Sequence, residues 1–591
     1  MYRVALAVAL ALIVVALFAL GRPGTPKLSD KPVSFNGSRA AADMRSIATQ
    51  FPQRVAGSDA DNRAGIWLVD QFDRLGLETH VQGFPATVDG ENVALQNVWA
   101  VAKGEAQGTI LVIANRDTPP LATQGANDNA SGVAALLELA RALKVTAHDR
   151  SIVFLATTGD AHGALGSRQF LQEYGSVDDL VAVIALREVA TRDRSGIGID
   201  GWSATPRMAP PWLWLLSGPA SRVHANDEAL LPGVTAQILH LAAPTSSGSH
   251  GPFVEAGIPG IMITADGPKV AARNDTLDSV SSETLNKVGS AVQSMMRTID
   301  SSSLPDARSG GTIFLTRQRT LPGGALVLML VALLLPLLAV AIDLFAHCRR
   351  ERVQLRPALL RAALHLVPWL IVVAIVYLAN LVGLLPQSPG AVIPPGSPVV
   401  DEPRYLRVVL LLAVLLLVYA YAVAVERRMA RGVQTDPRAT IFVAHVSLVA
   451  IAVVALLVNP YSVLLVLPAA VLWPLARPGG WTRSILPAYL GLIMVPIVLV
   501  YFATRLEIGW NVWWYFLLLM ETRTIPVIAV LFGVFFLSTA GTLAHTLHER
   551  GERTEDFGWR YAGAQDPSAE RRGREPRRLV NARLPRRRHG G

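Results

Sequence analysis

An acidic residue, Asp128, stands in a short loop with the sequence GANDNASG at residues 125–132. The loop follows a strand-like apolar run at residues 109–114 and precedes a run with helical spacing of apolar side chains at residues 133–144. A carboxylate on a loop where a strand gives way to a helix can reach a metal ion at the carboxyl edge of a sheet. Asp128 is therefore the first candidate for metal chemistry. On a generic loop it would instead cap the helix, as Ser131 could equally do.

This loop and the run after it, GANDNASG followed by VAALLELARALK, resemble peptidase family M28. The resemblance extends from near Ala40 to near Ile299, about half of the chain. It implies an α/β domain that removes N-terminal residues from peptides, and it implies that Asp128 bridges two zinc ions. Such a co-catalytic site needs five nitrogen or oxygen ligands and a carboxylate base that activates the bridging water.

Most of the ligand positions implied by the resemblance hold residues that bind zinc poorly or not at all. Asn115 stands where the first zinc histidine should be, although the aspartate that orients this histidine in the family is retained as Asp117. Ala161 occupies the position of an acidic ligand, and Arg187 occupies that of another acidic ligand after a strand. Asp160 matches the general base, but it is one methylene shorter than glutamate and would reach a water less well.

Two implied metal ligands are retained, Asp128 and His250, the latter in GSHGPF ahead of GIP. His162 and Glu188 are possible substitute ligands. Glu188 lies one residue beyond the expected position, and it would need a bulge because side chains on a strand alternate between faces. Taken alone, Asp160 would more often be a solvated loop carboxylate and His162 an exposed histidine.

Arg187 would place a positive charge where the second metal is missing. It could occupy that volume and pair with Asp128, so that an ion pair replaces a cation. Residues 274–278, NDTLD, match the end of a further family motif, but Ala271 replaces its leading histidine. We therefore expect zinc to be absent or reduced to one ion.

Residues 37–303 alternate helix-like and strand-like runs, which predicts an α/β domain with a mainly parallel sheet core flanked by helices. Several strand-like runs are almost continuously apolar, as expected for central strands covered on both faces. The predicted helices are residues 40–50, 61–75, 133–144 and 282–298, and the predicted strands are residues 96–102, 109–114, 151–156, 180–186 and 259–264.

The second half of the chain predicts an all-α, multi-span transmembrane bundle, because its apolar runs approach the roughly 20 residues that cross a bilayer. Residues 4–20 form a further apolar run without a clear cleavage site, so we favour an N-terminal signal anchor over a cleaved signal peptide. The predicted parts are an anchor at 1–21, linkers at 22–36 and 304–324, a bundle at 325–547 and a basic, disordered tail at 548–591. The seven predicted spans of the bundle are residues 325–346, 362–385, 408–425, 441–458, 463–475, 486–503 and 525–547.

The net charge of +9 is concentrated in loops between the apolar runs and in the tail, which indicates membrane topology and not nucleic-acid binding. The positive-inside rule places the basic loops and the tail in the cytoplasm and the α/β domain outside. The frequent use of Arg, Ala and Leu favours a bacterial source, so we expect a multi-pass protein of a bacterial plasma membrane. Membrane lipids are then partners, as are peptides or proteins in the cleft, while the oligomeric state stays open. The single cysteine, Cys348, excludes a disulfide within the chain and a cysteine-rich zinc site.

The sequence is compatible with three functions. The first is a pseudopeptidase that binds or scaffolds peptides or proteins without metals. The second is a zinc-dependent hydrolase with a reduced or rearranged site, such as one zinc ion held by Asp128, His250 and either Asp160 or His162. The third is a transporter-like or lipid-interacting bundle, which the small number of ionisable residues near the span centres disfavours.

Overall fold

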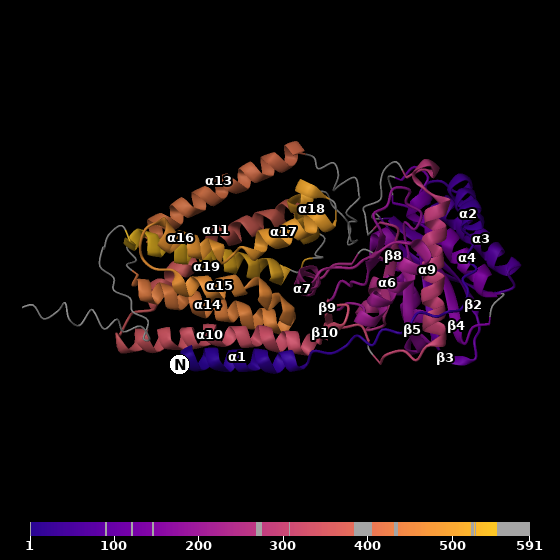
Figure 1. Ribbon diagram of the computed structural model, residues 1–591. Helices are drawn as coiled ribbons and strands as arrows, with labels where there is room; N and C mark the ends of the chain where they lie inside the picture. Colours follow the sequence, from indigo (N-terminus) through magenta and orange to yellow (C-terminus); the bar gives the residue numbers. More distant parts are fainter. Residues whose placement is uncertain are drawn as a thin grey trace, which may run out of the picture.

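The apolar strand-like runs form one eight-stranded sheet in the computed structural model (Figure 1). The strand order is β1-β2-β4-β3-β5-β8-β6-β7, and the four central strands β4, β3, β5 and β8 are mutually parallel. The bounds are β1 (Glu78–Val88), β2 (Glu91–Ala102), β3 (Ala106–Asn115), β4 (Arg150–Thr157), β5 (Leu180–Leu186), β6 (Ile197–Asp200), β7 (Ala229–Leu230) and β8 (Gly260–Thr264). The structure describes residues 2–88, 91–119, 122–144, 147–246, 248–266, 275–306, 308–382, 405–430, 435–506, 508–521, 525 and 527–551.

Alternation along β3 explains why helices cover both faces of the sheet. Ile110 and Val112 pack into one buried cluster with helices α2, α4, α6 and α9, while Leu111 and Ile113 pack into a second cluster with α5 and α8. Each fully buried side chain of this kind contributes about 1.5–3 kcal/mol. The helices are α2 (Gly37–Gln50), α3 (Asp59–Arg74), α4 (Gly132–Lys144), α5 (Leu165–Glu173), α6 (Pro211–Ala225), α7 (Val234–Ala242), α8 (Gly251–Glu255) and α9 (Ser282–Ser301).

This architecture confirms the predicted α/β domain with a mainly parallel core. Each predicted strand and helix of the domain is present, with ends that differ by a few residues. The elements not predicted from the sequence are β1, β6, β7, α5, α6, α7 and α8. Of these, β1 and β2 form an antiparallel hairpin at one edge, and β6 runs antiparallel to β8 near the other edge.

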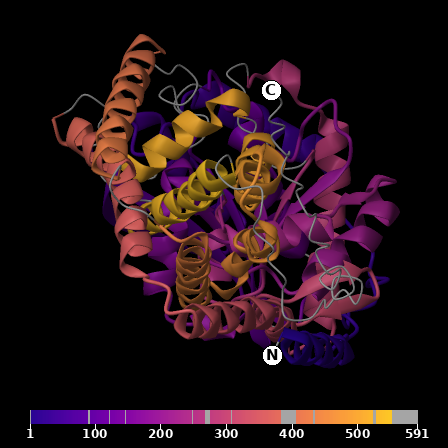
Figure 2. The ribbon, with the colours of Figure 1, turned by 90° about the vertical axis from the view of Figure 1, so that its left-hand side faces the viewer.

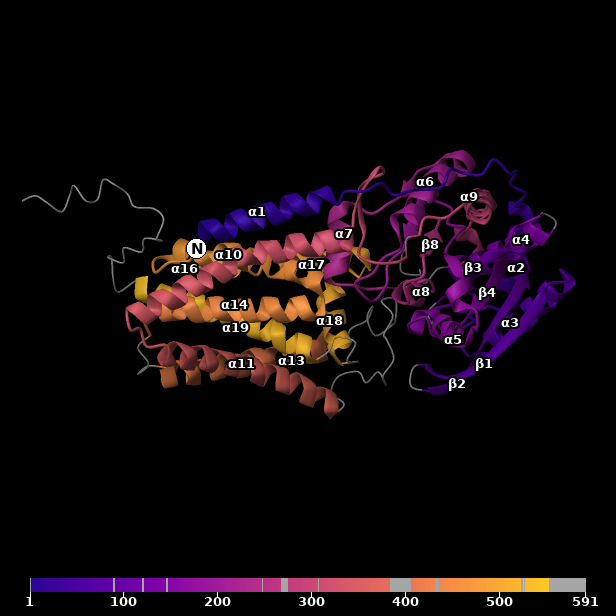
Figure 3. The same cartoon turned by 90° about the horizontal axis from the view of Figure 1, so that it is seen from below.

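The bundle lies at one end of the domain, and Figure 2 looks along it toward the domain behind. Four of the described helices are long and apolar enough to cross a membrane, or five if a bent pair is one span. The N-terminal helix α1 (Tyr2–Phe18) lies along α10, as Figures 1 and 3 both show. The helices are α10 (Gly323–Arg350), α11 (Arg356–Leu381), α13 (Tyr405–Ala430), α14 (Pro437–Val458), α15 (Leu467–Leu472), α16 (Trp481–Leu490), α17 (Met494–Arg505), α18 (Val512–Glu521) and α19 (Val527–Gly551).

Two of the seven predicted spans differ from the structure. Residues 463–475 do not form one continuous helix, since two 3-10 segments flank the six-residue α15, and Pro468 and Pro474 remove backbone donors there. Residues 486–503 are divided between α16 and α17, which are bent by 44° relative to each other. The basic tail at 552–591 and much of the loop before α13 lie outside the described residues.

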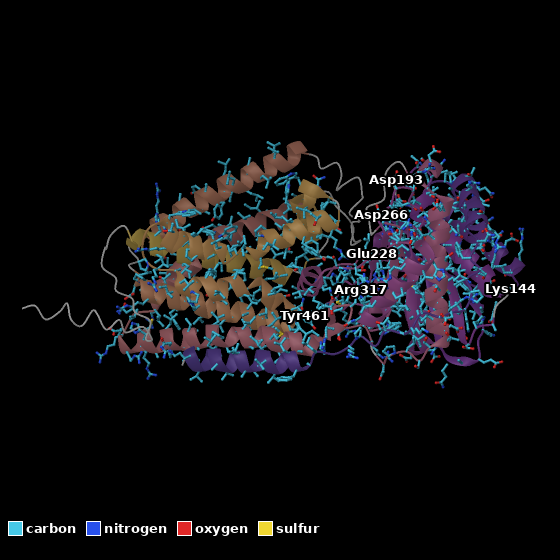
Figure 4. All side chains as sticks on the ribbon, in the orientation of Figure 1. Lys144, Asp193, Glu228, Asp266, Arg317 and Tyr461 are labelled. Atoms are coloured by element: carbon cyan, nitrogen blue, oxygen red, sulfur yellow. The ribbon has the colours of Figure 1, made fainter. Side chains whose placement is uncertain are left out.

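Close contacts join the bundle to the domain. Tyr461, labelled in Figure 4, follows α14, and its hydroxyl lies so near Gly311 that a Cβ there would approach within 1.8 Å. Asn459 Nδ2 donates to the carbonyl oxygen of Leu241 at 2.8 Å, and Ser462 Oγ donates to that of Ala242 at 2.9 Å. These carbonyls end α7, where an α-helix leaves acceptors without a partner of its own. The bundle therefore completes the hydrogen bonding of a domain helix.

Candidate active site

The candidate residues lie together because they follow neighbouring strands of the sheet. Asn115 ends β3, and Asp128 lies in the turn between β3 and α4. Asp160 follows β4 in a short 3-10 turn, and Arg187 directly follows β5. The carboxyl ends of parallel strands meet at one edge, so these side chains face a shared volume.

Arg187 occupies the centre of this volume. Its Nη2 atom lies 2.9 Å from Asp128 Oδ2 and its Nη1 atom 3.8 Å from Asp160 Oδ2, while its Nε atom lies 3.5 Å from Glu188 Oε1. The predicted ion pair with Asp128 is therefore present. Burial alone would lower the pKa of Arg187, but the three carboxylates outweigh burial and raise this pKa above its usual value. We name these four residues the Arg187 cluster.

The backbone around Asp128 is fixed by Asp275. Its two carboxylate oxygens accept hydrogen bonds from the backbone N–H groups of Asn127 and Asp128, both at 2.7 Å. Burial raises the pKa of Asp275 to about 6, although these N–H groups oppose the rise. Ala271, the position of the missing histidine, lies outside the described residues.

Asp160 is buried, so the expectation of a solvated loop carboxylate was wrong. Its Oδ1 atom accepts a hydrogen bond from Ser249 Oγ at 2.5 Å, and its backbone N–H donates to Asp117 Oδ2 at 3.1 Å. Burial raises the pKa of Asp160, and the charge of Arg187 opposes this rise. Burial also raises the pKa of Asp117 well above its usual range.

Asn115 makes amide hydrogen bonds where the family resemblance implies a zinc histidine. Its Oδ1 atom accepts a hydrogen bond from Asn129 Nδ2 at 3.0 Å, and its Nδ2 atom donates to the carbonyl oxygen of Asp117 at 3.1 Å. Asn129 Oδ1 in turn accepts from the backbone N–H of Glu188 at 3.2 Å. The amide oxygen of Asn115 is therefore already engaged within the protein.

His250 lies in a second cluster, which we name the Arg505 cluster after the residue that the bundle contributes. His250 Nε2 lies 3.5 Å from Asp200 Oδ1, and Arg505 Nη2 lies 3.0 Å from Asp200 Oδ2. The guanidinium of Arg505 also covers the ring of Trp202 at 5.3 Å. Burial alone would raise the pKa of Asp200, but Arg505 and then His250 outweigh burial and lower it to about 2.

The side chains present do not fit a pair of zinc ions. Asn115, Ala161 and Arg187 replace three donors, and the guanidinium of Arg187 forms ion pairs with Asp128 and Asp160. Among the residues that the structure describes, no group of three or more His, Cys, Asp or Glu side chains could hold a metal ion. The possible substitutes do not form such a group either. Glu188 faces Arg187, and His162 is buried and not exposed as expected.

Sequence reasoning missed Asp200, Ser249 and Arg505. Ser249 directly precedes His250, so its motif could have drawn attention to it. Asp200 ends a four-residue strand, and Arg505 ends an apolar helix. Nothing in the local pattern connects these two residues, which are 305 positions apart.

With the geometry established, comparison with known proteins identifies the domain. Residues 97–296 match the model of peptidase family M28. These residues form a peptidase family M28 domain. The matched residues begin within β2 and end within α9, and they include all four residues of the Arg187 cluster.

Two relatives match parts of this M28 domain. The alkaline phosphatase isozyme conversion protein of Escherichia coli (strain K12) is 30% identical over 190 residues, which cover 28% of this chain and 54% of that protein. Aminopeptidase YwaD of Bacillus subtilis (strain 168) is 27% identical over 190 residues, which cover 31% of this chain and 39% of that protein. The chain thus spans about half or less of the length of these relatives.

Solved structures with similar folds include a zinc aminopeptidase, BSAP, from Bacillus subtilis. It is 16% identical, with 46% of this chain and 97% of that chain covered and a TM-score of 0.40. A glutaminyl cyclase from Porphyromonas gingivalis is 23% identical, with 45% of this chain and 98% of that chain covered and a TM-score of 0.38.

Proposed function

We propose that this protein is a membrane-embedded pseudopeptidase, whose M28 domain is a metal-free scaffold for protein or peptide contacts and does not hydrolyse peptides. The observation that carries the proposal is the guanidinium of Arg187 between Asp128 and Asp160. A cation that is covalently part of the chain balances the carboxylates there, so the fold needs no metal for charge balance. A guanidinium also cannot activate a bound water as zinc does.

The closure of the described site favours scaffolding over capture of a peptide in the cleft. The side chains of Asp128 and Asp160 are 3% and 4% exposed, and that of Arg187 is 17% exposed. His250 is fully buried. The described candidate side chains are thus packed against the protein itself, where a peptide cannot replace their contacts without rearrangement.

The M28 domain lies outside the cytoplasm in this proposal, and the bundle anchors it in the membrane. Basic residues such as Arg349 and Arg350 in the last turn of α10 favour the cytoplasm, and this end of α10 lies far from the domain (Figure 1). The apolar helices of the bundle support the membrane assignment.

An activity screen tests the proposal. The full-length protein, purified in detergent with zinc supplied, is assayed against a panel of aminoacyl and peptide substrates beside the matched variant Asp160→Ala. We expect no turnover that distinguishes the two proteins. Zinc-dependent turnover that Asp160→Ala abolishes would establish the hydrolase with a rearranged site instead.

A further inference from the structure

Arg505 is a residue of the bundle that contacts the interior of the M28 domain. It ends α17, the second half of the bent helix pair. An arginine at the end of an apolar helix ordinarily extends to lipid headgroups and water. Here the side chain is only 13% exposed, and its partner Asp200 is 1% exposed. The guanidinium is therefore held by the protein and not by the membrane surface.

Three contacts fix this guanidinium. Arg505 Nη2 donates to Asp200 Oδ2 at 3.0 Å, and Nη1 donates to Tyr501 Oη at 3.1 Å. The guanidinium plane lies over Trp202, with 5.3 Å from Cζ to the ring centroid. Trp202 in turn packs against His240, with ring centroids 4.2 Å apart, so the arginine is covered by the domain. Asp200 in turn links the arginine to His250, because its Oδ1 atom lies 3.5 Å from His250 Nε2.

Asp200 has little other compensation for its charge. The backbone N–H of Trp202 donates to Oδ1 at 3.0 Å, and the imidazole of His250 lies beside the same oxygen. A buried carboxylate without a cation is strongly unfavourable, and removal of one partner of a buried pair costs more than the pair contributes. Within the part of the chain that the structure describes, Arg505 is the permanently charged cation that forms an ion pair with Asp200.

We propose that the bundle supplies, through Arg505, the positive charge that holds the His250 side of the M28 site together. The inference rests on the proposed function, because it treats the site as metal-free. Arg187 comes from the domain and balances the Asp128 side, while Arg505 comes from the bundle and balances the Asp200 side. Arg505 is a positioning residue, since it acts on His250 through Asp200. The M28 domain and α17 form one electrostatic unit, and displacement of α17 rearranges the site.

Hydrogen exchange of the full-length protein in lipid nanodiscs tests the inference. The readout is backbone exchange at residues 197–203 and 248–255, which contain Asp200 and His250. Arg505→Gln is expected to raise exchange there by about tenfold or more, because local opening becomes easier. The matched control Arg168→Gln removes an arginine that pairs with Glu255 at 2.9 Å on the domain surface, and it should leave residues 197–203 unchanged.

A second variant separates charge from packing. In Asp200→Asn/Arg505→Gln no buried charge lacks a partner, so this double variant should regain most of the protection that Arg505→Gln loses. Arg505→Lys should retain part of the protection from exchange, since an ammonium can reach Asp200 but stacks less well on Trp202. If Arg505→Gln fails to fold, recovery of folding in the double variant supports the inference.

Two results would overturn it. One is unchanged exchange at both segments in a folded Arg505→Gln protein. The other is a double variant as unprotected or as unfolded as the single variant, which would show that the guanidinium acts by packing alone. Zinc in the wild-type preparation would overturn the proposed function and not this inference, because the exchange comparison measures Arg505 independently of metal content.

Discussion

The Arg187 and Arg505 clusters balance buried carboxylates with guanidinium groups, but the two arginines come from different parts of the molecule. Arg187 and Asp128 lie 59 positions apart within the M28 domain, whereas Arg505 and Asp200 lie 305 positions apart and join the domain to the bundle. The first cluster is thus complete within the domain. The second is complete only when the bundle is docked.

In the proposed function, the two arginines provide the positive charge at the two halves of the site, and the α/β fold is retained without a metal ion. Asn115, at a position where the family resemblance implies a zinc ligand, accepts a hydrogen bond from Asn129. On the other side, His250 is retained, yet its nearest charged neighbour is held by an arginine of the bundle.

The largest effect is expected from Arg187→Ala. This change leaves Asp128, Asp160 and Glu188 without their shared cation, and removal of one partner from a buried ion pair typically costs about 3–5 kcal/mol. We expect a clear fall in the thermal unfolding midpoint of the full-length protein in detergent. Arg168→Gln is the surface control, since exposed pairs contribute about 0–1 kcal/mol. Equal unfolding midpoints for Arg187→Ala and Arg168→Gln would contradict the claim that Arg187 stabilises the buried carboxylates.

A smaller effect is expected from Arg505→Gln. It removes the cation from one carboxylate, whereas Arg187→Ala removes it from three, and Asp200 keeps the N–H of Trp202, so we expect a loss of about 2 kcal/mol. The double variant Asp200→Asn/Arg505→Gln should lose less than the single variant. The thermal midpoints of wild type, Arg505→Gln, Asp200→Asn and the double variant measure this coupling. Strictly additive effects of the two substitutions would show that the ion pair does not stabilise the protein.

The pH dependence of stability should distinguish the two clusters, because a buried histidine, His240, lies beside the Arg505 cluster. Burial, and then the charge of Arg505, lowers the pKa of His240 to about 3. The unfolded state therefore binds a proton near pH 6.5 while the folded state does not. The stability contributed by neutral His240 is present above about pH 6.5 and is lost as the pH falls toward about 3.

His240→Gln should flatten this acid-side loss of thermal stability, while His80→Gln, which changes an accessible imidazole, should not. Asp200 and His250 also face this region, so both variants are compared with Asp200→Asn to separate their contributions. Identical pH profiles for wild type and His240→Gln would exclude His240 as the titrating group.

The smallest effect is expected from Asn115→His. The change restores an imidazole at an implied ligand position but breaks the hydrogen bond from Asn129, at a cost of about 1 kcal/mol. Arg187 still occupies the centre, so we expect no gain in zinc affinity by calorimetric titration. Tight zinc binding by this single variant would show that Arg187 yields to a metal ion.

The sequence predicted those features that depend on local pattern or on a fixed motif order. Continuous apolar runs predicted β3, β4, β5 and β8, because central strands must be buried on both faces. The motif order placed Asp128 and Arg187 at neighbouring strand ends, and their ion pair followed from opposite charges in one small volume. Mostly polar or very short strands, such as β1 and β6, lacked this signal.

Other features depended on tertiary contacts that no local pattern encodes. Asp160 follows Gly159 in a polar stretch, yet the surrounding loops bury it. The predicted span at 463–475 has the apolar composition of a membrane helix, but its prolines divide it. The Arg505–Asp200 pair requires the docked arrangement of domain and bundle, which sequence spacing does not supply.

Metal content of the wild-type protein tests the central claim most directly. The full-length protein is expressed with zinc supplied, purified in detergent, dialysed without chelator and analysed for zinc per chain by mass spectrometry. The account predicts no zinc above the buffer blank in folded protein, because Arg187 already provides the cation at Asp128 and Asp160. One or two tightly held zinc ions per folded chain would contradict the metal-free account and would favour a zinc-dependent hydrolase.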